Sequence, residues 1–76
     1  MTWNYRIVDM ACDDEEPIYE IREVFYNNKH EPFAHGDAGV VGETIGEMKE
    51  VMELMELAFT KPVLLSSTDF ENSYDC

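Results

Sequence analysis

The sequence predicts a small α+β fold: a three-stranded antiparallel sheet packed against one amphipathic helix, followed by a disordered acidic C-terminal tail. Three observations indicate this fold class. Two stretches near the N-terminus alternate in the manner of strands. A later stretch repeats apolar residues at helical spacing. The chain has 76 residues, which is enough for one domain with a thin core.

The predicted strands form a meander at residues 3–10, 18–26 and 33–35. In the first strand, Trp3, Tyr5 and Ile7 point to one side of the sheet because side chains alternate along a strand. The second strand is rich in β-branched and aromatic residues, which strands favour. Pro32 indicates that the third strand lies at an edge, since proline cannot donate a ladder hydrogen bond.

The helix is predicted over residues 45–60. Thr44, followed three residues later by Glu47, is typical of a capping box, and Pro62 ends the helix. Six apolar residues recur at helical spacing and form one stripe: Ile45, Met48, Val51, Met52, Met55 and Phe59. The stripe predicts that the helix lies across one face of the sheet. The expected core consists of Trp3 or Tyr5 with Ile7, Ile21, Phe25, Met48, Met52, Met55 and Phe59.

Residues 1–65 are expected to form a single α+β domain, and 66–76 a disordered tail, because the tail is polar, acidic and unpatterned. Phe70 and Tyr74 are the tail residues able to dock on the sheet. No hydrophobic stretch resembles a signal peptide or a membrane span. We expect a cytoplasmic protein of a bacterial host cell, with Cys12 and Cys76 reduced.

Charge is the most unusual property of the chain. Seventeen Asp and Glu residues stand against five Lys and Arg, which gives a formal net charge of -12. Such a charge attracts cationic surfaces at long range. It argues against nucleic acid as a direct ligand, because phosphate contacts dominate that affinity. The expected partner is therefore a cationic protein, namely a nucleic-acid-binding complex.

No motif predicts catalysis, and we expect neither an enzyme nor a metal or other cofactor. The spacing of His30 and His35 matches no zinc pattern. Residues 13–16 lack the alternating ligands and central glycine of a calcium loop. The glycines after the third strand precede no phosphate-binding lysine.

The glutamates of the helix carry the main functional hypothesis. Side chains three or four residues apart on a helix are separated by about 5–6 Å, a scale similar to that of successive backbone phosphates. Lys49 is the only lysine available within the helix to neutralise them. The candidate partner-binding residues are Glu43, Glu47, Glu50, Glu53 and Glu56, with a second patch at Asp13, Asp14, Glu15 and Glu16. The alternative is an ordinary solvated helix face.

Leu54 and Leu57 lie on the acidic side of the helix rather than on the apolar stripe. Either residues 63–65 fold back over them, or they form an exposed apolar anchor surrounded by carboxylates. The second arrangement is typical of a protein interface.

The order strand, strand, strand, followed by Gly42-Glu43-Thr44 at the start of an acidic helix, resembles the small domain of HicB-type antitoxins over residues 3–60. The sequence departs from that family in two respects: we expect no second, DNA-binding module within these 76 residues, and the third strand lacks the family's usual pattern. Several segments are also similar to a group of short bacterial proteins of uncharacterised function: residues 3–8, 23–26, 42–44 and 61–64. In charge and size the chain resembles phage-encoded DNA mimics, including anti-CRISPR and anti-restriction inhibitors.

These features predict an acidic inhibitor that acts as a DNA mimic and blocks the nucleic-acid-binding surface of a defence or DNA-processing complex. The alternative is a HicB-like antitoxin or regulatory module that binds and masks a small basic toxin or effector. A third interpretation is a minor enzyme or a metal-binding accessory protein.

Overall fold

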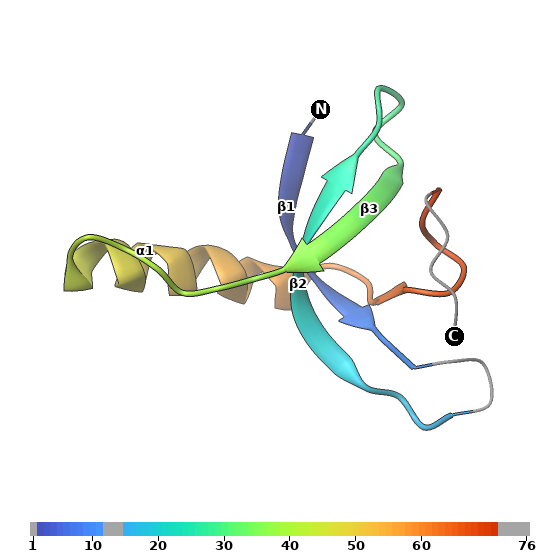
Figure 1. Cartoon of the computed structure of the whole chain (residues 1–76), viewed down its shortest axis with the longest axis horizontal. Coiled ribbons are helices and arrows are strands. Elements are labelled where there is room, and N and C mark those ends of the chain that lie inside the picture. Colours follow the sequence, from blue (N-terminus) through green and yellow to red (C-terminus); the bar gives the residue numbers. More distant parts are fainter. Residues whose placement is uncertain (1, 12–14, 72–76) are drawn as a thin grey trace.

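The computed structural model describes residues 2–11 and 15–71. Three strands precede one helix, as the sequence predicts, and a 3-10 turn and a short fourth strand follow (Figure 1). The bounds are Thr2–Asp9 for β1, Tyr19–Tyr26 for β2, Pro32–Asp37 for β3, Ile45–Glu56 for α1, Leu57–Thr60 for the 3-10 turn η1, and Leu64–Leu65 for β4. The α+β class is confirmed.

The sheet has four strands in the order β3-β2-β1-β4, and it is mixed rather than purely antiparallel. β2 pairs antiparallel with both β1 and β3, and β3 lies at an edge, as Pro32 indicated. β4 pairs parallel with β1, with Val8 opposite Leu64. This pairing corrects the three-stranded prediction. It satisfies backbone groups along the outer edge of β1 that would otherwise lack partners, and the Arg6 guanidinium, which donates to the Pro62 carbonyl at 2.7 Å, holds the approaching chain.

The core lies on the opposite face of the sheet from the one expected. Val8 and Val24 are fully buried and form a cluster with Phe70, which is 7% exposed. Ile7 and Ile21, on the other face, are only half-buried. The difference arises because residues 66–71 pack against the sheet and cover the Val8 face. The prediction that the tail is disordered is therefore wrong for 66–71, and residues 72–76 lie outside the described part of the chain.

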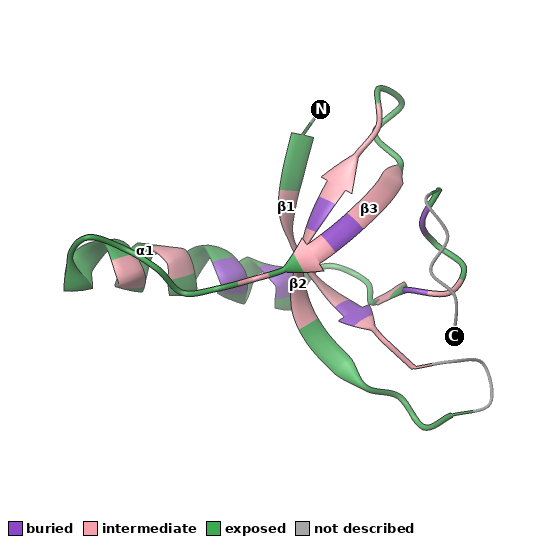
Figure 2. Ribbon diagram, viewed as in Figure 1, coloured by how far each residue is buried: buried purple, intermediate pink, exposed green. Residues whose placement is uncertain are grey.

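The helix does not lie across the sheet. Residues 38–43 lead away from β3, and α1 returns along them, so that α1 projects from the sheet as an arm (Figure 1). Only its C-terminal end reaches β1 and becomes buried, at Met55 and at Ala58 of η1 (Figure 2). Ile45, Met52 and Phe59 are 81%, 60% and 70% exposed. The predicted apolar stripe exists, but among residues 2–11 and 15–71 most of its length has no cover.

The expected core residues consequently divide into three groups. Met55 is buried. The half-buried residues are Tyr5, Ile7, Ile21, Phe25 and Met48. The exposed residues are Trp3, Met52 and Phe59.

Candidate protein-interaction surface

The start of α1 has the predicted cap in a slightly altered form. The Thr44 hydroxyl accepts from the Glu47 backbone N–H at 3.1 Å. The Glu47 carboxylate reaches back and accepts from the N–H of Glu43, at 2.7 Å, rather than from that of Thr44. Gly42 permits this close return, since an added Cβ would lie 2.8 Å from the Glu47 Cβ. Glu47 therefore has a structural role in addition to its negative charge.

The five candidate glutamates at the arm, Glu43, Glu47, Glu50, Glu53 and Glu56, are all exposed. Within residues 2–11 and 15–71, the ion pairs join Arg22 to Glu20 and to Asp37, and none involves a glutamate of α1. Because α1 projects from the sheet, its outer side can approach a partner without steric hindrance from the rest of the domain (Figure 1). The arm thus presents a row of carboxylates that form no ion pair within the described part of the chain.

The second predicted patch is separate from the first. Glu15 and Glu16 are exposed in the connection between β1 and β2. The described part of that connection lies at the opposite end of the molecule from the start of α1 (Figure 1). Asp13 and Asp14 lie outside the described residues. The structure therefore does not bring Glu15 and Glu16 together with the helix glutamates into one surface.

Leu54 and Leu57 are 53% and 56% exposed, because residues 63–65 run along β1 instead of folding back over them. They form one wall of a groove of about 320 Å³ between the helix end and the start of β1. The groove is lined by Trp3, Asn4, Tyr5, Leu54, Leu57 and Lys61. The Trp3 and Tyr5 rings meet edge to face with centroids 5.2 Å apart. We call this the leucine groove.

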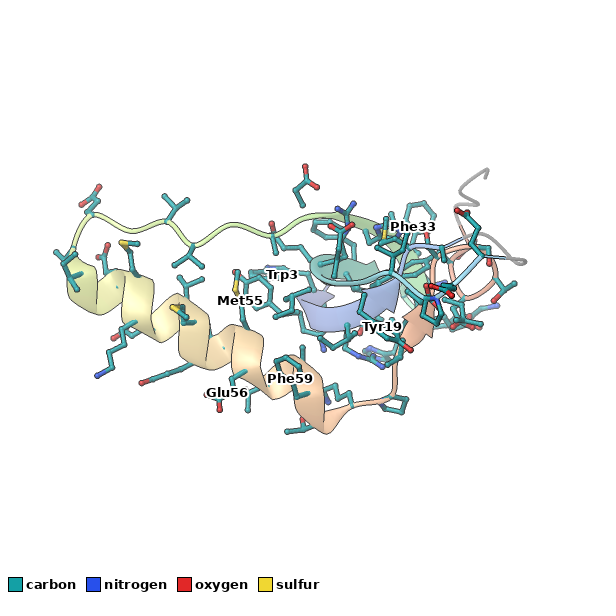
Figure 3. The ribbon with its side chains drawn as sticks, turned by 90° about the horizontal axis from the view of Figure 1, so that it is seen from below. Trp3, Tyr19, Phe33, Met55, Glu56 and Phe59 are labelled. Carbon is teal, nitrogen blue, oxygen red and sulfur yellow. The ribbon has the colours of Figure 1, made fainter. Side chains whose placement is uncertain are left out.

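Sequence reasoning assigned Trp3 or Tyr5 to the core and did not include Lys61 in any site. Trp3 is 49% exposed and lies at the wall of the leucine groove (Figure 3). The sequence could have indicated this groove, because side chains alternate along a strand and the Trp3 and Tyr5 rings therefore lie on the same face of β1. Aromatic residues of this kind are enriched at the energetically important centres of interfaces.

A buried polar cluster on the other face of the sheet contains a His–Ser pair, His35 and Ser66. Its hydrogen bonds do not allow the histidine to activate the serine as a nucleophile. The His35 Nε2 lies 3.0 Å from the Ser66 Oγ, while Arg22 Nε donates to His35 Nδ1 at 3.1 Å. Since Nδ1 accepts, the neutral ring carries its proton on Nε2 and cannot take one from Ser66. Burial first, and the Arg22 guanidinium second, lower the pKa of His35, while Glu20 acts in the opposite direction.

Two further features bear on the kind of site. Among the residues that the structure describes, no three or more His, Cys, Asp and Glu side chains group together as metal ligands would. In the same part of the chain, no helix has the length and apolar character needed to cross a bilayer.

Comparison of the chain with protein-family models, curated proteins and solved structures found no match.

Proposed function

We propose that this chain is an acidic inhibitor that binds a cationic protein and occupies the surface with which that protein grips nucleic acid. The observation that carries the proposal is the projecting arm, whose exposed glutamates have no intramolecular ion pair among the described residues. Carboxylates about 5–6 Å apart along a helix can present a field similar to that of phosphates. The net charge of -12 accelerates encounter with a cationic surface.

The leucine groove supplies the apolar part of this interface. Leu54 and Leu57 are exposed beside the carboxylates, and Trp3 stands opposite them. Charge complementarity governs mainly the rate of association and its specificity. A desolvated apolar centre governs mainly the rate of dissociation. The two kinds of residue therefore have separable kinetic effects.

The alternative function is a HicB-like antitoxin or regulatory module that masks a small basic toxin or effector. The order β1-β2-β3-α1 and the leucine groove support it. In that case most of the binding free energy comes from apolar contacts, and nucleic acid does not compete.

The experiment captures the partner from a bacterial lysate, identifies it, and measures its binding to the purified chain across salt concentrations with and without duplex DNA. DNA should displace the chain, and affinity should fall steeply as salt rises. Reversal of Glu50 and Glu53 to Lys should abolish binding and leave the helix intact, because Lys and Glu have similar helix propensities. Glu47 is excluded from the variant because it caps the helix.

The comparison variant reverses Glu16, of the separate second patch, and Glu31, both exposed and outside α1, and so changes the net charge equally. It should weaken binding far less. Simultaneous binding of DNA and this chain to the partner would refute mimicry. Equal losses in the two charge-reversed variants would show that the attraction depends on net charge rather than on the arm.

A further inference from the structure

We propose that two copies of this chain form a symmetric dimer in which the apolar side of each arm seats against the sheet of the other copy. Two surfaces are involved. The arm ridge consists of Ile45, Met52 and Phe59. The sheet groove lies between η1 and the sheet and is lined by Ile7, Tyr19, Glu20, Ile21, Phe59, Lys61 and Val63.

The arm ridge is a line of large apolar side chains that no other described residue covers. Ile45 and Met52 are seven residues apart and lie along one side of α1, and Phe59 follows seven residues later in η1. Ile45 and Met52 are separated by about 10 Å along the axis of α1, at about 1.5 Å per residue. The exposures of Ile45, Met52 and Phe59 are 81%, 60% and 70%, so each presents more than half of its surface to solvent. The sequence predicts that the whole apolar stripe is core, but burial is confined to the side of the helix that carries Met55.

The sheet groove is the complementary surface. Its volume is about 340 Å³, and most of its lining is apolar. Phe59 of η1 and Tyr19 of β2 both line it, although they belong to different elements (Figure 3). Tyr19 is 61% exposed and Val63 is 44% exposed, so the groove is open to a ligand. Phe59 belongs to both surfaces and makes them continuous.

The surface area of the chain indicates how much it leaves uncovered. A compact monomer of 8.8 kDa is expected to expose about 4,800 Å², whereas this chain exposes 5525 Å². The difference of roughly 700 Å² is close to the ~800 Å² that each partner buries in a standard interface. The radius of gyration of 13.1 Å likewise exceeds the roughly 11.4 Å of a compact domain of this length, because the arm projects.

A second copy fits because both surfaces belong to the same chain. A two-fold axis would place each ridge in the other copy's groove, so that both apolar surfaces are covered at once. Charges also match locally. Lys49 and Glu56 border Met52 at helical spacing, while Glu20 and Lys61 border the groove. Glu50 and Glu53 lie on the other side of the helix and remain available to a cationic partner.

Salt should change the affinity of the dimer and the affinity for a cationic partner in opposite directions. Each copy carries a charge of -12, so repulsion between the copies opposes association. Salt screens that repulsion. The dimer should therefore tighten as salt rises, whereas binding to a cationic partner should weaken.

Sedimentation velocity and light scattering of the purified chain, over about 1–500 µM and at about 0.05 and 0.5 M NaCl, test this proposal. The expected result is a dimer whose dissociation constant falls at the higher salt concentration. Met52→Gln should raise that constant at least about tenfold. Leu54→Gln is the matched control on the opposite side of the helix and should leave it unchanged. Circular dichroism confirms that both variants fold.

A mixing experiment tests the reciprocal arrangement. A ridge variant, Ile45→Gln with Met52→Gln, and a groove variant, Tyr19→Ser with Val63→Gln, should each dimerise poorly alone. Their mixture keeps one intact ridge–groove contact and should associate more tightly than either variant by itself. Monomers at every concentration and salt, an equal effect of Leu54→Gln, or a mixture no tighter than its components would each overturn the proposal. These results leave the cationic-partner proposal unaffected, since no partner is present.

Discussion

Phe70→Ala tests whether the C-terminal segment is structural. Phe70 is 7% exposed and belongs to the cluster formed with Val8 and Val24. Its ring meets that of His35 at a centroid distance of 4.6 Å and an interplanar angle of 66°. Truncation to alanine therefore removes one of the few side chains that bury the core face of the sheet.

The expected loss is about 4 kcal/mol. A phenylalanine side chain buries on the order of 200 Å², and about 25 cal/mol per Å² gives roughly 5 kcal/mol for its complete removal from water. Alanine retains part of that area, and measured Phe→Ala changes in cores cost about 3–5 kcal/mol. A domain of this length has a total stability of about 4–11 kcal/mol. The substitution therefore removes a large share of the total.

Urea denaturation monitored by circular dichroism measures the change, at a protein concentration low enough to keep the chain monomeric. Phe59→Ala is the matched control, because the same residue type is 70% exposed there. It should cost less than about 1 kcal/mol. If the two variants lose the same free energy of unfolding, residues 66–71 do not stabilise the sheet and our description of the core is wrong.

Three further changes have defined outcomes. Because the pKa of His35 is lowered in the folded state, its contribution to stability is complete above about pH 6.5 and is lost as pH falls below that value, by at most about 1.4 kcal/mol per pH unit. Thermal unfolding across pH should show this slope in wild type and in the exposed control His30→Asn, and a flatter slope in His35→Gln. Gly42→Ala should reduce helical circular dichroism, because the new Cβ would lie 2.8 Å from a Cβ of the first helical turn; an unchanged spectrum would refute this. Met52→Ala should cost less than about 1 kcal/mol in the monomer, since Met52 is 60% exposed, and a loss above 2 kcal/mol in urea denaturation would contradict the exposed ridge.

Local patterns predicted the elements well because short-range physics decides them. The Thr44 cap depends on atoms within one helical turn, and α1 begins at the expected residue. Alternation identified β1 and β2, and Pro32 identified an edge strand. The exposed glutamates of the arm also followed from helical spacing, since Glu43, Glu47, Glu50 and Glu53 lie away from the apolar stripe and Glu56 lies at its margin.

Only the tertiary structure shows which surfaces of the sheet and the helix pack against other parts of the chain. Both faces of β1 carry apolar residues, so alternation could not show that Val8 rather than Ile7 would be buried. Phe70, which is 62 positions from Val8 in sequence, packs on the Val8 face of the sheet and buries it. The path of residues 38–43 then carried the start of α1 away from the sheet and left its stripe uncovered. Periodicity shows that a helix has an apolar side, but contacts distant in sequence determine what, if anything, covers it.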